Sequence, residues 1–130
     1  MPIVEHDLDI PRRVYKAQVC AQAAADATEL KAILGRLPRE GEMERINLAA
    51  AEAGHRLGAA DYVASIRAGQ NFTRAMALLW DDVDVLLTPA LAGPAPTLGT
   101  FPTDHDDVDL HVARMLRFSP FTATYNVTRS

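Results

Sequence analysis

Serine hydrolysis needs a hydroxyl beside a base, together with backbone donors for the oxyanion that forms. The three serines offer little: Ser65 falls in the middle of a predicted helix, Ser119 directly precedes a proline, and Ser130 ends the sequence. The two lysines, Lys16 and Lys31, fall on one predicted helix and are typical of a solvated helix face. No Gly-Gly pair occurs, so the usual glycine-rich oxyanion loop is missing. These residues give no catalytic site.

The thiol and one group of acids also favour structural roles. Cys20 lies in an alanine-rich stretch, which predicts a small core-facing side chain rather than an exposed nucleophile. Asp81, Asp82 and Asp84 lack the spacing and the terminal glutamate of a calcium-binding loop. We therefore expect these three aspartates to be hydrated.

The stretch HDDVDLH at 105–111 is rich in groups that can ligate a metal ion. Its two histidines, His105 and His111, are six residues apart, which puts them on different faces if both belong to one helix. We expect no metal site and no cofactor. A metal-dependent protein remains an alternative interpretation, beside the two that are set out below.

The composition is that of one globular domain in a cytoplasmic setting. The chain has 130 residues, of which 48% are hydrophobic and 23% charged, enough for a single core. Its formal charge of -4 gives phosphate backbones and anionic lipids no general attraction, so we expect no nucleic-acid partner. A single cysteine, an acidic N-terminus and the lack of an apolar run of roughly 20 residues predict a cytoplasmic protein without a membrane partner.

Helical periodicity covers most of the chain. The pattern predicts a short helix after Ser119-Pro120, preceded by four longer ones over about 12–35, 43–57, 59–82 and 106–118. The helix over 59–82 has the clearest pattern. We expect its apolar stripe to be buried: Tyr62, Ile66, Gly69, Phe72, Met76, Leu79 and Trp80.

The spacing of the apolar residues is no longer helical between residues 83 and 88. Here β-branched and apolar residues stand between aspartates and Pro89, which predicts a strand buried on both faces, as in parallel sheets. Such a strand needs a hydrogen-bonding neighbour at each edge, and no second strand of similar quality is encoded. Residues 89–105 follow as a proline-rich loop. The expected fold is thus an α/β fragment, mostly helical, forming a single incomplete domain over 1–130.

Two ordered segments resemble a known family. The stretches DVLLTPALAGPAPTLG at 84–99 and FSPFTATYNVT at 118–128 resemble the C-terminal third of the amidase signature hydrolases. In that family a strand ends in Thr-Pro, a proline-rich loop closes with Leu-Gly, and a Pro-Phe-Thr helix carries an Asn two residues before a Thr. The helical stretches at 19–26 and 58–66 also resemble the family's long helices.

The resemblance implies an α/β/α sandwich with a mixed sheet, which hydrolyses carboxamide C–N bonds through a serine acyl-enzyme, with a Ser, cis-Ser, Lys triad and no cofactor. The glycine- and serine-rich segment that carries the family's two serines is absent, so no catalytic residue is assigned. By analogy Thr88, Pro89, Phe121 and Asn126 line the substrate pocket. We expect a C-terminal fragment that is inactive alone. Its partners would be the missing N-terminal half or a second copy, and the intact parent would act on a small-molecule amide.

A non-enzymatic helical protein-interaction module is the alternative. In this interpretation the apolar stripe of 59–82 is exposed and binds a partner helix. A cooperatively melting chain that hides its apolar faces favours the module, whereas dye binding and aggregation favour the fragment.

Overall fold

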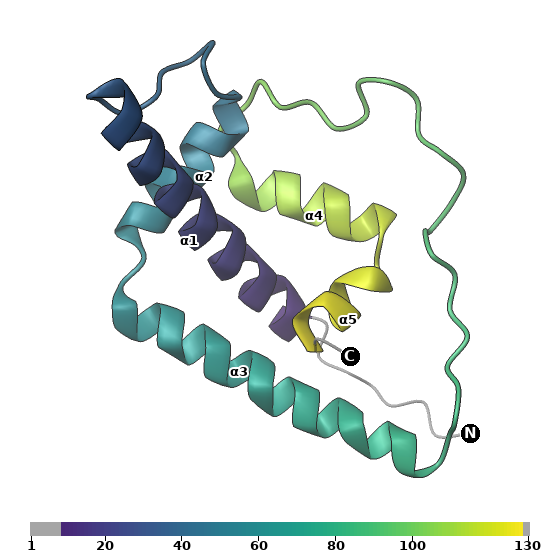
Figure 1. The fold of residues 1–130 in the computed structure, drawn as a ribbon. Helices are drawn as coiled ribbons and strands as arrows, with labels where there is room; N and C mark the ends of the chain where they lie inside the picture. Colours follow the sequence, from purple (N-terminus) through teal and green to yellow (C-terminus); the bar gives the residue numbers. More distant parts are fainter. Residues whose placement is uncertain (1–8, 129–130) are drawn as a thin grey trace.

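Five α-helices and one 3₁₀ turn make up the regular structure of residues 9–128, the part of the chain that the computed structural model describes (Figure 1). In chain order these elements are α1 (Asp9–Leu34), α2 (Arg45–Arg56), α3 (Ala59–Ala77), η1 (Leu78–Asp81), α4 (Val108–Phe118) and α5 (Thr122–Thr128). No helix among these is long and apolar enough to cross a lipid bilayer.

Helix α1 is the centre of the arrangement. It contacts α2, α3, α4 and α5, and it lies between α3 and the α4–α5 pair (Figure 1). Its first turn carries Asp9 and Pro11, residues that suit a helix start because an acid complements the dipole and a proline loses no internal hydrogen bond there.

Small residues let α1 and α2 approach closely. Cys20, Ala24 and Ala27 of α1 are buried, as are Ala50 and Ala51 of α2. A Cβ atom placed on Gly54 of α2 would lie 2.8 Å from the Cβ of Ala24 and still nearer to the carbonyl group of Cys20. The alanine-rich face of α1 therefore contributes close backbone packing rather than a large buried area.

Larger side chains form a second, compact cluster between α1 and α3. Val14 of α1 packs with Phe72 and Met76 of α3, and partly buried apolar residues surround these three. The stripe predicted for α3 is therefore buried only in its central part. Tyr62 and Trp80 at its two ends are 38% and 44% exposed, because α1 covers only part of its length.

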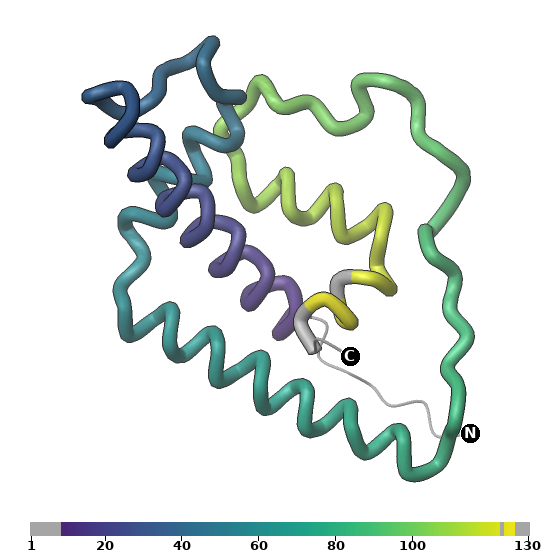
Figure 2. The backbone as a smooth tube through the Cα atoms, in the orientation of Figure 1, coloured from purple at the N-terminus to yellow at the C-terminus, as the bar shows by residue number. Residues whose placement is uncertain are grey.

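A long connecting segment (residues 82–107) joins η1 to α4 without helix or strand. Figure 2 traces it in green along the outer edge of the molecule. It is tied down near its end, where the Thr103 carbonyl accepts a hydrogen bond from Ile46 N at 3.0 Å. The amide of Ala92 donates to the Phe118 carbonyl at 2.9 Å, and the rings of Phe101 and Phe118 lie 5.5 Å apart.

The α/β sandwich with a buried core strand over 83–88 was the wrong prediction. The described residues hold no strand, only an isolated bridge between Glu40 and Met43 in the loop after α1. Val85 and Leu87 are 80% and 94% exposed. The apolar run at 83–88 is present in the sequence. A strand, however, is stabilised by neighbours along both edges, and this chain supplies none within the described residues.

The helical part of the prediction agrees with the structure, with small shifts at the ends. The third helix stops at Ala77 and tightens into η1, and α4 begins at Val108 because Asp107 caps it: the Asp107 carboxylate accepts from Leu110 N at 2.8 Å. Ser119 is the C-terminal cap residue of α4.

Candidate functional site

The serines have local partners. The Ser65 hydroxyl donates to the Tyr62 carbonyl at 2.8 Å, and the Ser119 hydroxyl donates to the Met115 carbonyl at 3.2 Å. Both oxygens therefore bond to their own helix, and neither lies beside a base in the described contacts. Ser130 lies outside the described residues.

Lys16 and Cys20 also serve structure. Lys16 donates to both carboxylate oxygens of Asp109, at 2.7 and 2.8 Å, which ties α1 to α4. Cys20 is 3% exposed, as its alanine-rich setting predicted. Burial raises the pKa of the Cys20 thiol, although the charge of Lys16 opposes the rise. A neutral, buried thiol is a poor nucleophile.

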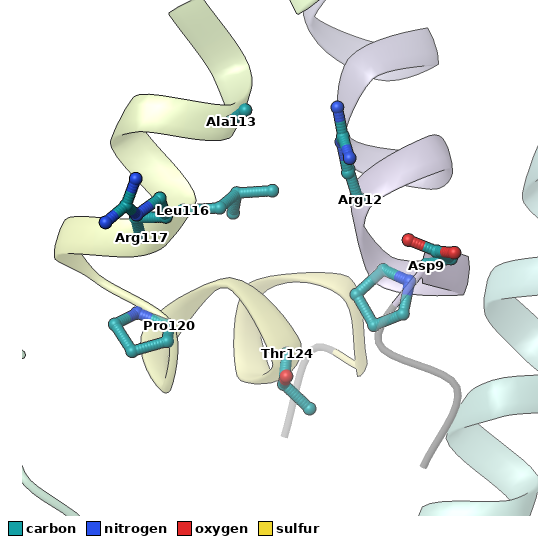
Figure 3. Close-up of a pocket in the computed structure, with 8 residues that line it drawn as sticks. Asp9, Arg12, Ala113, Leu116, Arg117, Pro120 and Thr124 are labelled. Atoms are coloured by element: carbon teal, nitrogen blue, oxygen red, sulfur yellow. The ribbon is translucent and has the colours of Figure 1, made fainter. Parts of the chain in front are cut away.

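A surface groove of about 520 Å³ opens where the start of α1 faces α4 and α5 (Figure 3). Its lining residues are Asp9, Pro11, Arg12, Ala113, Leu116, Arg117, Pro120 and Thr124. Figure 3 shows Leu116 extending from α4 toward α1, while Arg12 forms part of the opposite wall. The groove thus combines an apolar floor with guanidinium groups from two helices.

This chemistry suits binding rather than bond cleavage. Guanidinium groups such as those of Arg12 and Arg117 hold carboxylates and other planar anions. The only hydroxyl among the lining residues is Thr124, and no histidine, cysteine or lysine stands beside it there. The groove therefore offers no histidine, cysteine or lysine for nucleophilic catalysis, and Asp9 is the carboxylate among its lining residues.

Sequence patterns did not reveal this groove. Its walls come from residues 9–12 and 113–124, which are distant in the chain and meet only because α4 and α5 fold back on α1. The cluster of basic residues in the first turns of α1, Arg12 and Arg13, was the one local signal available.

The four residues expected to line a substrate pocket lie on two separate elements. Thr88 and Pro89 belong to the connecting segment, where Pro89 is exposed. Phe121 directly precedes α5, and Asn126 lies exposed within it. None of the four lines the groove, although Pro120 and Thr124 beside them do. Their role as a pocket wall stays a prediction.

His105 and His111 come together although their spacing argued against it. The structure places His105 before α4 instead of on it, and the chain turns so that the two ring centroids lie 5.5 Å apart. Burial lowers the pKa of His111, with smaller contributions from the charges of His105 and Arg114. A lowered pKa favours the neutral form of the His111 ring.

The aspartates at 81, 82 and 84 are exposed, in line with the expectation that they are hydrated. Among the residues that the structure describes, no group of three histidine, cysteine, aspartate or glutamate side chains gathers in one place.

Comparison with known proteins identifies an amidase-related region in this chain. The protein named "Putative amidase AmiD" from Mycobacterium tuberculosis is 33% identical over 88 residues, and its Mycobacterium bovis counterpart matches equally well. The match covers 68% of this chain but 18% of each relative, so the chain spans less than a fifth of the length of these relatives. No protein-family model and no solved structure matches the chain.

Proposed function

We propose that this chain is the C-terminal portion of an amidase signature hydrolase, whose intact form cleaves carboxamide C–N bonds through a serine acyl-enzyme. The observation that carries the proposal is the 33% identity to amidase-named relatives over 88 residues. The ordered motifs at 84–99 and 118–128 support the same assignment. A cytoplasmic location is part of the proposal, and a buried, unpaired Cys20 is consistent with a reducing compartment.

The chain alone does not hydrolyse amides in this proposal. Ser65 and Ser119 are engaged by helix carbonyls, and Lys16 is engaged by Asp109. Acyl transfer needs a free hydroxyl, a base and an oxyanion hole in one place. These described side chains lie in three different settings, which supports a division of labour in which another polypeptide segment supplies the nucleophile.

In the intact hydrolase, Thr88 and Pro89 form one part of the substrate pocket wall, and Phe121 and Asn126 form another. Pro89 and Asn126 are exposed, as residues that meet a separate segment should be. The remaining part of the amidase or a second copy of the chain is the proposed partner, and a small carboxamide is the substrate of the intact hydrolase.

An amide-hydrolysis assay tests the proposal directly. The purified chain should release no ammonia from benzamide above the buffer rate, and Ser65→Ala, Ser119→Ala and Lys16→Ala should leave that background unchanged. Turnover that one serine substitution abolishes would contradict the assignment.

The DNA on both sides of the coding sequence is a second test of the proposal. An in-frame glycine- and serine-rich segment there would support the assignment to an amidase signature hydrolase.

A second candidate, a non-enzymatic interaction module, is favoured by the exposed apolar residues around η1. Leu78 is 68% exposed, and the nearby Trp80 is 44% exposed. This candidate differs from the first in one respect: its partner is an apolar helix rather than an amidase catalytic segment. Capture of such a helix with benzamide hydrolysis absent in every reconstituted mixture would favour it.

A further inference from the structure

The contact between His105 and His111 contains buried polar atoms. Both ring nitrogens of His105 and Nδ1 of His111 are buried, and among residues 9–128 no hydrogen-bond partner is found for any of them. Buried polar atoms without partners are rare in native proteins because each loses its hydration without replacement. A cluster of three such atoms on two touching side chains points to a ligand.

The ring separation fits one metal ion shared by two imidazoles. Imidazole nitrogens bind Zn²⁺ at about 2.0–2.1 Å, which puts the ion about 3.2 Å from each ring centroid. At a tetrahedral angle the two centroids would then lie about 5.2 Å apart. The observed centroid distance is 5.5 Å, and the planes are tilted by 49°.

We propose that His105 and His111 together bind a divalent transition-metal ion of the Zn²⁺ class. Imidazole favours Zn²⁺, Cu²⁺ and Ni²⁺, while Mg²⁺ and Ca²⁺ favour oxygen ligands. No third histidine, cysteine or carboxylate converges with this pair among the described residues, so the proposed site has two protein ligands. With two protein ligands the site binds less tightly than a four-ligand structural zinc site.

The ion would fasten the connecting segment to α4. His105 lies near the end of that segment, and His111 lies one turn into α4, beyond the Asp107 cap. The neighbouring contacts are few and exposed: Arg45 pairs with Asp106 at 3.3 Å, and Thr103 donates to Glu44 at 3.2 Å. A coordinate bond at each histidine would add a link to the backbone hydrogen bond from Ile46 N to the Thr103 carbonyl, which already holds this end of the segment.

Titration calorimetry of the full chain with ZnCl₂ in metal-free buffer tests the site. All proteins carry His6→Ala, because His6 lies outside the described residues and could compete as a ligand. We expect one Zn²⁺ per chain, no heat with MgCl₂, and at least a tenfold loss of affinity in His105→Ala and in His111→Ala. His55→Ala is the matched control, since His55 is exposed on α2 away from the pair. It should bind as before.

A second measurement avoids reliance on variants that fold poorly. In the His6→Ala chain, ¹⁵N imidazole resonances of His105 and His111 should shift together on Zn²⁺ addition, while those of His55 stay in place. No saturable binding, or equal binding by the His105→Ala and His111→Ala chains with helix content preserved in circular dichroism, would overturn the proposal. Shifts confined to His55 would overturn it too.

Discussion

Three hydrogen bonds to one carboxylate close the loop between α1 and α2. The Arg36 guanidinium donates two hydrogen bonds to the Glu42 carboxylate, at 2.7 and 2.8 Å, and Arg39 N donates a third at 2.9 Å. The Arg36 bonds, with help from Arg39, lower the pKa of Glu42 to about 2. Three donors on one carboxylate favour its charged form, so the loop is held by charge rather than by burial.

This pair predicts a specific acid response. Since the pKa of Glu42 is lower in the folded chain than its ordinary value of 4.5, the pair contributes stability above pH 4.5, and this contribution is lost as the pH falls toward 2. Its size is small because both side chains are exposed. Carboxyl NMR titration should give a Glu42 pKa near 2, which Arg36→Ala should raise. Arg56→Ala is the control and should not move it; an Arg36→Ala titration equal to wild type would contradict the account.

Two residues on α4 allow a comparison of how much an ion pair and a buried apolar side chain each contribute to the free energy of unfolding. Asp109 makes the exposed ion pair with Lys16, whereas Val112 is 3% exposed. Asp109→Asn should lower the free energy of unfolding by less than about 1 kcal/mol. Val112→Ala should lower it by about 2 kcal/mol, since it removes buried methyl groups and leaves a cavity. Urea denaturation measures both, and the reverse order would show that α4 is held mainly by its ion pair.

The close contact between helices α1 and α2 depends on the lack of a side chain at Gly54. Gly54→Ala normally helps a helix by about 1 kcal/mol. Here the added methyl group would collide with Ala24 and the Cys20 backbone, so we expect a net loss of about 1–3 kcal/mol in urea denaturation. Gly93→Ala is the matched control, because no atom lies within 4 Å of its added Cβ. A stabilised Gly54→Ala chain would mean that the two helices are farther apart than described.

The elements also show which parts of the structure the sequence predicts. Helices α1 to α4 follow from periodicity because a helix satisfies its own hydrogen bonds, so the necessary information is local. The segment 83–88 has a local apolar pattern, but a strand depends on partners elsewhere, and the prediction was wrong. The α1–α4–α5 groove and the His105–His111 contact escaped prediction for the same reason: each depends on how separate elements are placed.

Over the described residues, many large apolar side chains of the molecule are in contact with water. Exposed apolar residues gather along η1 and the connecting segment: Leu78, Trp80, Val85, Leu86, Leu87, Leu91 and Leu98. The buried apolar residues are mostly smaller, with alanines prominent among them. A larger protein could cover such residues, and the chain spans 18% of the length of its amidase-named relatives. Both facts fit the proposed dependence on another segment of an amidase.

This distribution predicts dye binding that specific substitutions remove. The chain should bind anilinonaphthalene sulfonate while its helix content is intact, because exposed leucines near η1 offer apolar contact. Leu78→Ser combined with Leu87→Ser should lower the fluorescence at least twofold with little change in unfolding free energy, since both side chains are mostly exposed. Ile33→Ser, at the far end of α1 and 74% exposed, controls for loss of any single apolar residue. Dye fluorescence that Leu78→Ser and Leu87→Ser leave unchanged would place the apolar surface elsewhere. A large loss of stability in that double variant would instead show that the segment after η1 is packed in solution, and the interpretation of an uncovered amidase portion would fail.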